Sequence, residues 1–301
     1  MAPERTSPIS RLFAGKTGPV LVVVLAIIAI WYAGAVYLNA PFQMDTYKRG
    51  HIENVPVTQL VTDTLNQDRP VLPAPHQVAE EIWKTTVLKK ITSKRSLIYH
   101  AGITLSSTLL GFIIGTVLGI VLAVGIVHSR VLDKSLMPWV ISSQTIPILA
   151  IAPMIIVVLN AVGISGLLPK AFISTYLSFF PVTVGMVKGL RSPEILHLDL
   201  MRTYNASKGQ VFWKLRFPYA VPYLFTSMKI AVAASLVGAI VGELPTGAVS
   251  GLGARLLSGS YYGQTVQIWS ALIAASVMAA VLVALVGVVN GFVLKRMGMA
   301  R

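Results

Sequence analysis

The sequence predicts an all-α membrane protein that crosses a bilayer about six times. The 301 residues are 54% hydrophobic and only 12% charged, with a mean hydropathy of +0.72. Soluble globular chains carry about 25% charged residues. The apolar residues gather in runs of roughly 20 or more, the length that an α-helix needs to cross the hydrocarbon core. Several segments between these runs are short and rich in Lys and Arg, as cytoplasmic loops are.

The first apolar run is Pro19–Leu38, which follows three basic residues. A secretory signal has a shorter apolar core that ends in a small-residue cleavage site, whereas this run ends in aromatic residues typical of a membrane interface. We therefore predict a cytoplasmic tail at residues 1–18 and a retained transmembrane helix at residues 19–39.

Residues 40–96 form the longest polar stretch, which we predict to be extracytoplasmic. Pro56, Pro70, Pro73 and Pro75 indicate a loop. An amphipathic helix is predicted after it at Gln77–Lys90, with apolar side chains along one side. This helix would lie on the membrane surface or dock on a partner, and the sequence does not decide between the two.

Five further apolar runs form a predicted transmembrane core at residues 97–294. They are Leu97–Val127, Leu136–Leu159, Leu167–Gly189, Ala220–Val241 and Val266–Leu294. Within the second of these runs, Pro147 and Pro153 remove backbone donors, so we expect a kinked or broken helix there.

Glycines recur at every fourth position in two of the runs. Gly111, Gly115 and Gly119 leave one side of a helix without side chains, which allows another helix to approach closely. Gly287 and Gly291 do the same in the last run. The approaching helix would belong to the same subunit or to a second one.

The distribution of charge sets the predicted orientation. From residue 188 to residue 216 there are six basic and two acidic residues, which places this segment in the cytoplasm by the positive-inside rule. With the N-terminus on the same side, residues 128–134, a loop at 191–219 and a tail at 295–301 are cytoplasmic. Residues 160–166 and 243–265 then lie outside.

Several classes of function lack the residues that they need. The chain has no cysteine, so thiol redox chemistry and thiolate metal sites are excluded. A phosphate-binding loop has the pattern G-x-x-x-x-G-K-[ST]. Gly15-Lys16-Thr17 matches its end, but Ser10 stands where the first glycine is needed, so we expect no ATP site in this chain. The five histidines show no metal-ligand spacing, and we predict no catalytic residue, metal or bound cofactor. The net charge of +14 lies largely in short loops and tails, as an orientation signal does, and we expect no nucleic acid partner.

The acidic residues of the core argue against coupling to an ion gradient. Between residues 97 and 294 the acids are Asp133, Glu194, Asp199 and Glu243, of which only Glu243 could lie near the membrane. Ion-coupled carriers place titratable groups near the bilayer midplane. We therefore expect the energy for any transport to come from a partner.

The polar segment Leu198–Pro218, LDLMRTYNASKGQVFWKLRFP, resembles the E-A-A signature of permease subunits of bacterial binding-protein-dependent ABC importers. Asp199 stands at the glutamate position, Leu200 and Met201 at the two alanines, Asn205 at the glycine, and Leu215 and Pro218 in the closing motif. Residues 72–78 (LPAPHQV), 144–153 (QTIPILAIAP) and 202–207 (RTYNAS) are similar to further motifs of the nitrate, sulfonate and taurine permeases.

This resemblance implies a type I, MetI-like importer fold in the bacterial inner membrane. It also implies a second permease subunit, identical or related, two ATPase subunits that bind ATP and Mg²⁺, and an extracytoplasmic solute-binding protein. The solute would be small and polar or anionic, either nitrate-, sulfonate- or taurine-like or pyrimidine-like. A secondary carrier and a non-transporting membrane scaffold are the alternative interpretations.

By the same resemblance, the cytoplasmic loop couples the chain to its ATPase. Its candidate residues are Asp199, Leu200, Met201, Arg202, Tyr204, Asn205, Ala206, Lys208, Leu215 and Pro218. Apolar side chains on short helices would fill a groove of the partner, while basic side chains fix orientation at its rim. The alternative is an amphipathic loop resting on anionic lipid headgroups.

Two further sets of residues are candidates for the transport path. The polar pathway candidates are Ser142, Ser143, Gln144, Thr145 and Asn160, although packing hydrogen bonds would explain such residues equally well. Glu243, Leu252 and Leu256 are gate candidates, in a glycine-rich segment from residue 246 to residue 263. The alternatives are a structural pair of Glu243 with Arg255 or another basic group, and a fixed plug instead of a gate.

Overall fold

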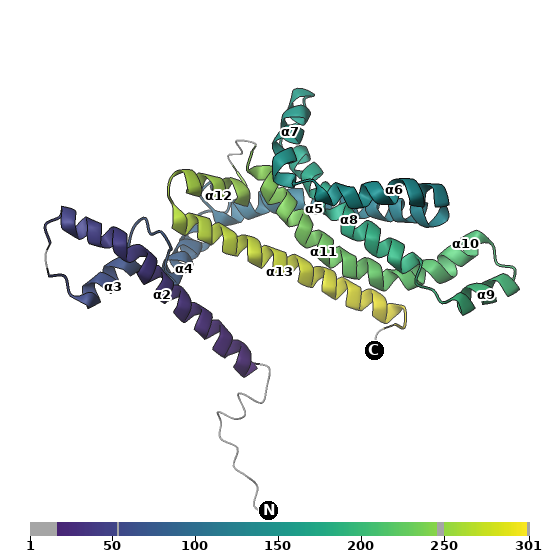
Figure 1. Ribbon diagram of the computed structural model, residues 1–301, viewed down its shortest axis with the longest axis horizontal. Helices are drawn as coiled ribbons and strands as arrows, with labels where there is room; N and C mark the ends of the chain where they lie inside the picture. Colours follow the sequence, from purple (N-terminus) through teal and green to yellow (C-terminus); the bar gives the residue numbers. More distant parts are fainter. Residues whose placement is uncertain (1–16, 53, 246–249, 300–301) are drawn as a thin grey trace, which may run out of the picture. The chain divides into compact units, whose positions relative to one another are not determined.

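The computed structural model describes residues 17–52, 54–245 and 250–299, and in these ranges every regular element is a helix (Figure 1). The chain divides into two compact units. The first unit comprises Met1–Leu88 and Ser258–Ser270, and the second comprises Lys89–Leu257 and Ala271–Arg301. Residues 1–16 of the predicted N-terminal tail, residue 53, residues 246–249 at the start of the glycine-rich segment and the last two residues lie outside the described ranges.

The first unit contains α2 (Thr17–Arg49), α3 (Val57–Leu65), α4 (Pro75–Trp83) and a π-helical turn, Lys84–Leu88. The predicted amphipathic helix at Gln77–Lys90 corresponds to α4 and this turn. Helix α2 continues ten residues past the end of the predicted span at residues 19–39 and passes through Pro41.

A polar stripe explains why α2 continues beyond the predicted span. Asn39, Gln43 and Tyr47 are spaced four residues apart and so lie on one side of the helix. The Asn39 amide donates to the carbonyl of Leu72 at 2.9 Å, and Gln43 Oε1 accepts from the Gln67 amide at 2.8 Å. The Tyr47 hydroxyl lies 2.5 Å from an Asp63 carboxylate oxygen. These contacts fix α3 and the proline-rich segment after it against the second half of α2.

The second unit holds the rest of the core. Its elements are α5 (Leu97–His128), α6 (Arg130–Ser142), α7 (Ile148–Ala161), α8 (Leu167–Leu190), α9 (Ile195–Thr203), α10 (Lys208–Val211) and α11 (Phe217–Glu243), together with parts of α12 (Leu252–Tyr261) and α13 (Thr265–Arg296). Five helices in the described part of the chain are long and apolar enough to cross a membrane, or six if the bent pair α6–α7 is one span. The prediction of an all-α protein with about six spans is confirmed.

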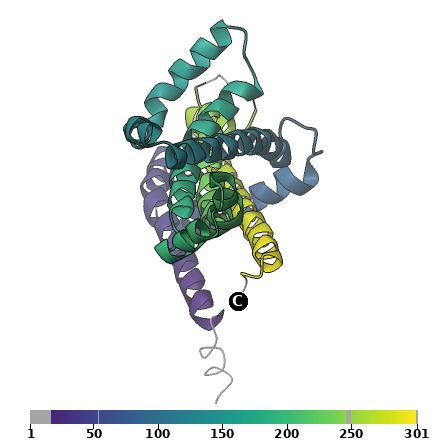
Figure 2. The ribbon, with the colours of Figure 1, turned by 90° about the vertical axis from the view of Figure 1, so that its right-hand side faces the viewer.

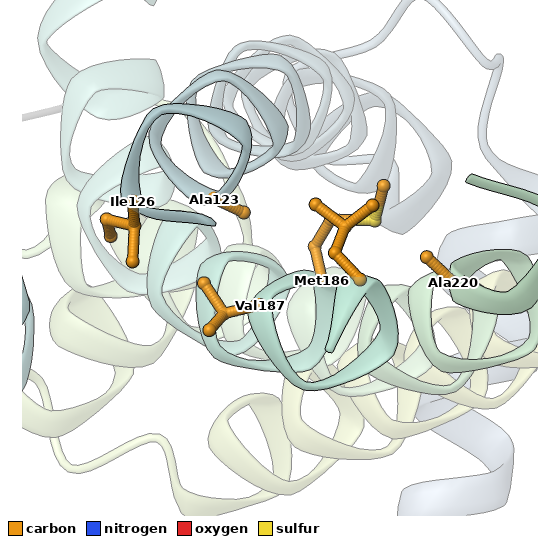
Figure 3. Packing of buried hydrophobic residues seen from close by; sticks show 6 residues of the cluster. Ala123, Ile126, Met186, Val187 and Ala220 are labelled. Carbon is orange, nitrogen blue, oxygen red and sulfur yellow. The ribbon is translucent and has the colours of Figure 1, made fainter. Parts of the chain in front are cut away.

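Helix α8 packs closely against both α5 and α11. Gly111, Gly115 and Gly119 of α5 lie directly on α8, since a Cβ at Gly115 would stand 2.1 Å from Ser178 Oγ. At the other end of the same interface, Ala123 and Ile126 of α5 meet Met186 and Val187 of α8 and Ala220 of α11 (Figure 3). The glycines at residues 111, 115 and 119 therefore allow close packing of α5 on α8 within one subunit.

The apolar run Leu136–Leu159 forms a broken helix, as expected from Pro147 and Pro153. Helix α6 ends at Ser142, residues 143–145 form a 3₁₀ turn, and α7 starts after Pro147 at an angle of 102° to α6. Helix α7 packs on α8 and α11, where Ala152 and Ile156 meet Ile173 and Val241, and only its far end projects away from them (Figures 1 and 2). Pro147 lacks an N–H and has an extended backbone, so the helical hydrogen bonding stops there.

Candidate functional site

A groove with a cavity volume of about 850 Å³ lies between α8 and α11, beside the break that separates α6 from α7. We call it the α8–α11 groove. Its walls are mainly apolar and include one aromatic ring from each helix, Phe180 and Tyr223. Its polar lining consists of Gln144, Lys188, Thr226 and Ser227.

Of the five polar pathway candidates, only Gln144 lines this groove. Ser143 and Thr145 lie in the same 3₁₀ turn, and their hydroxyl groups donate to the carbonyls of Val140 and Ser142, at 2.7 and 2.8 Å. The carbonyl of Ser143 accepts from the hydroxyl of Tyr176 in α8, which ties the break to the core. Packing hydrogen bonds thus account for Ser143 and Thr145.

The remaining pathway candidates lie elsewhere. Ser142 is exposed at the end of α6, and Asn160 is exposed near the far end of α7, twelve residues beyond the start of that helix. No sequence motif predicted Phe180, Tyr223, Thr226 or Ser227 as lining residues. Four side chains on one side of α11, at residues 223, 226, 227 and 230, follow the helical period and line the groove, and this pattern was a signal that could have found them.

The predicted coupling loop consists of two short helices joined at Asn205. Asn205 has a φ of +49°, a conformation that favours glycine and is next most accessible to asparagine. This explains why Asn205 fills the glycine position of the motif. Ser207 then begins α10 with a capping box, in which its backbone N–H donates to Gln210 Oε1 at 2.8 Å.

The loop presents both charged and apolar side chains to its surroundings. Arg202 and Asp199 form an ion pair at 2.9 Å on the exposed side of α9. Leu200 and Tyr204 are exposed to 51% and 76%, although both are large and partly or wholly apolar. Met201 and Ala206 are half-buried, Lys208 is exposed, and Leu215 is buried where the loop joins α11, one turn before Pro218.

Glu243 lies in a second cluster, at the opposite end of α11. The cluster holds the start of α12 through three consecutive backbone N–H groups. Gly251 donates to His100 Nδ1 at 3.0 Å, Leu252 to Thr104 Oγ1 at 2.9 Å, and Gly253 to Glu243 Oε2 at 2.8 Å. We call the three acceptors, His100, Thr104 and Glu243, the α12 anchor.

The groups of the anchor also support one another. The Thr104 hydroxyl lies 2.9 Å from Glu243 Oε1, and both side chains are fully buried. His100 Nε2 lies 2.9 Å from the carbonyl of Lys94, so Nε2 carries the proton and Nδ1 is free to accept. Buried N–H groups at a helix start need such acceptors, because the helix itself offers them none.

The gate candidates therefore lie in different surroundings. Glu243 and Leu252 are fully buried, whereas Leu256, one turn farther along α12, is half-buried. Gly251, with a φ of +125°, permits the close contact between Glu243 and the turn, since a Cβ there would stand 2.2 Å from the carboxyl carbon of Glu243.

The family of the chain is shown by its core. Residues 115–299 match the model of the binding-protein-dependent transport system inner membrane component. The chain belongs to this family. The expected resemblance to ABC importer permeases is confirmed, and the chain is a permease subunit of that kind.

Individual relatives agree with the family. A probable ABC transporter permease protein of Haemophilus influenzae is 31% identical over 61% of this chain and 69% of its own length. The formylaminopyrimidine transport permease protein ThiX of Halalkalibacterium halodurans is 33% identical over 61% of this chain and 68% of its own. The riboflavin transport system permease protein RibX of Chloroflexus aurantiacus is 32% identical over 62% and 65%. Relatives named for aliphatic sulfonates and for nitrate match at 23% and 26% identity.

Proposed function

We propose that this permease subunit forms part of a translocation pathway for a small solute in the bacterial inner membrane, and that a separate ATPase drives it through the α9–α10 loop. A binding protein delivers the solute, and a second permease subunit, identical or related, completes the pathway. The observation that carries the proposal is the exposure of Leu200 and Tyr204 beside the Asp199–Arg202 pair. An exposed leucine and an exposed tyrosine beside a charged pair are features of a protein docking surface.

Local contacts support a coupling role for this loop. Its helices are joined to the core by hydrogen bonds at their ends, where Arg216 donates to the carbonyl of Leu190 at 3.2 Å and Tyr219 meets His197 at 3.3 Å. A loop fixed at its ends and exposed in its middle can pass a displacement of the ATPase to α8 and α11. Those two helices also form the walls of the groove.

The alternative of an ion-coupled carrier has less support. In the described part of the core, the acids within possible membrane-spanning helices are Glu243 and Asp133, and Asp133 lies in the first turn of α6, where it pairs with Arg191 at 2.8 Å. The Glu243 carboxylate is occupied by Thr104 and Gly253. A carboxylate that holds a helix start in this way is poorly suited to bind and release a proton or Na⁺ in each cycle.

For the outer end, we propose a fixed plug at the start of α12. The hydrogen bonds of the α12 anchor and the burial of Leu252 support this over a gate at these residues. For Leu256 to move, α12 would have to bend after its first turn, because that turn is held by the α12 anchor. A cross-link between Leu256→Cys in paired subunits, if they are identical, should form with and without trapped ATP, and its loss with ATP would favour the gate.

Co-purification tests the coupling function. The tagged chain, extracted in mild detergent from its host, should bring a stoichiometric ATPase with it. Tyr204→Ala should reduce the amount of ATPase several-fold, whereas Tyr262→Ala, which removes a similarly exposed tyrosine from the segment between α12 and α13, should not. Absence of an ATPase from the wild-type preparation, or equal losses in both variants, would contradict the proposal.

The proposed orientation has its own test, because the chain contains no cysteine. Gly209→Cys and Ser260→Cys place a thiol at two exposed positions, and a Cβ at Gly209 meets no atom within 4 Å. An impermeant maleimide applied to intact spheroplasts should label the second variant and not the first. The reverse pattern would invert the topology.

A further inference from the structure

The α8–α11 groove carries information about the solute. The geometry points to a planar heteroaromatic molecule without a strong charge, of the size of a pyrimidine or a flavin ring system, as the compound that passes along this groove. This inference rests on the proposed function, because it assumes that the groove is part of the pathway. It concerns only the class of solute, which the proposed function leaves open.

The charges that line the groove argue against small ions. No acidic side chain lines it, so a cationic solute would find no counter-charge there. Lys188 is its only basic residue and is an exposed side chain near the end of α8 that leads to the α9–α10 loop. An inorganic anion such as nitrate loses its hydration on entering an apolar channel and needs several charged or N–H groups in compensation. One cation at the mouth does not supply them.

The apolar part of the lining suits a flat ring. Phe180 projects from α8 and Tyr223 from α11, so each wall of the groove contributes one aromatic ring. Val184 of α8 and Ile230 of α11 add apolar side chains to the same walls. Aromatic rings attract one another in stacked or edge-to-face arrangements, and small-molecule sites are mostly apolar with a few placed polar groups.

Apart from Lys188, the polar part of the lining is neutral and offers hydrogen bonds. The hydroxyl groups of Thr226 and Ser227 donate to carbonyls of their own helix, at 2.8 and 2.9 Å, which leaves their oxygen lone pairs free to accept. The Tyr223 hydroxyl makes no hydrogen bond to the described residues and is able to donate or accept. Ring nitrogens and amino groups of a heterocycle match such groups without any net charge. A surface that met only lipid tails would not need them.

Uptake by the whole transporter tests the inference. Proteoliposomes containing this chain with its second permease subunit, ATPase and binding protein are supplied with ATP and with riboflavin, a formylaminopyrimidine, nitrate or taurine. We expect ATP-dependent uptake of at least one of the two heteroaromatic probes, and none of nitrate or taurine. Uptake of nitrate or taurine alone would overturn the inference and leave the importer function intact.

A second readout separates failure of the inference from failure of the proposed function. If the binding protein stimulates ATP hydrolysis but neither heteroaromatic probe is taken up, the solute class is wrong and the importer stands. If the binding protein has no effect on ATP hydrolysis, the proposed function itself falls, and the inference falls with it.

Substitutions then locate the effect in the groove. Phe180→Leu and Tyr223→Leu remove one ring each while retaining an apolar side chain, and we expect each to lower the rate of heteroaromatic uptake about tenfold at low solute concentration. Phe172→Leu is the matched control, because Phe172 is an exposed phenylalanine of the same helix α8 that does not line the groove. Equal rates in all three variants would overturn the assignment of the solute to the groove, leaving lipid or a second copy of the chain as its occupant.

Discussion

The segments before and after α11, the α9–α10 loop and the start of α12, are stabilised by different kinds of contact. Before α11, the α9–α10 loop is held in shape by contacts between neighbours in sequence, namely the Asp199–Arg202 pair and the Ser207 capping box. After α11, the start of α12 is held by the α12 anchor, whose groups are up to 151 residues apart along the chain. A loop held by local contacts can move with a partner without losing its shape. A segment held by long-range buried contacts stays fixed to the core.

The comparison predicts that equal chemical changes at the two ends have unequal effects on stability. Buried groups that lose a hydrogen-bond partner cost about 1–3 kcal/mol each, whereas an exposed ion pair is worth about 0–1 kcal/mol. Changes at the α12 anchor should therefore lower the free energy of unfolding measurably. Changes in the α9–α10 loop should leave it folded and affect only its function.

The largest expected effect is that of Gly251→Ala. The new Cβ would stand 2.2 Å from the Glu243 carboxyl carbon, and a φ of +125° is strained for alanine. The anchor would have to separate, at a cost of about 3 kcal/mol or more. Heating in detergent followed by size-exclusion chromatography should show the loss. Gly102→Ala, on α5 where a Cβ meets no atom within 4 Å, is the control, and equal heat stability of the two variants would refute the role given to Gly251.

A smaller effect is expected for Thr104→Val. This change keeps the volume and removes the hydroxyl, so the Leu252 N–H and the Glu243 carboxylate each lose a partner. We expect a loss of about 2 kcal/mol in the free energy of unfolding, seen as a lower thermal midpoint. Thr104→Ser keeps the hydroxyl and should cost less than half as much, about the free energy of one buried methyl group. The hydrogen bonds would be unimportant if serine proved as harmful as valine.

The difference in construction also explains what the sequence could predict. The spans followed from apolar runs, and α5 and α8 end within one residue of their predicted bounds. The break at Pro147 followed from the chemistry of proline. The loop helices followed from local motifs. Hydrophobic runs, prolines and caps are all properties of neighbouring residues.

Long-range polar contacts leave no comparable pattern. The α12 anchor joins side chains of α5 and α11 to backbone groups of a third segment, and nothing in the sequence pairs Thr104 with Leu252. The extension of α2 depended in the same way on Asn39, Gln43 and Tyr47 finding partners in the segment after it. Their spacing of four was visible, but their partners were not.

The smallest effect on stability, and the sharpest test of the comparison, is reversal of the loop pair. Asp199→Arg or Arg202→Asp places like charges three residues apart on an exposed helix, which costs about 0.5 kcal/mol. The double variant restores the pair with its sign exchanged and should recover the wild-type thermal midpoint. If the pair served only to hold α9 together, the double variant would recover function as well.

A docking surface makes a different demand, because the partner reads the position of each charge. We therefore expect ATP hydrolysis stimulated by the binding protein to fall several-fold in both single variants and to stay low in the double variant, although all three remain folded. Recovery of hydrolysis in the double variant would show that the pair acts within the loop alone. The α9–α10 loop would then be a locally stabilised structure like any other, and the contrast with the buried α12 anchor would be one of stability only.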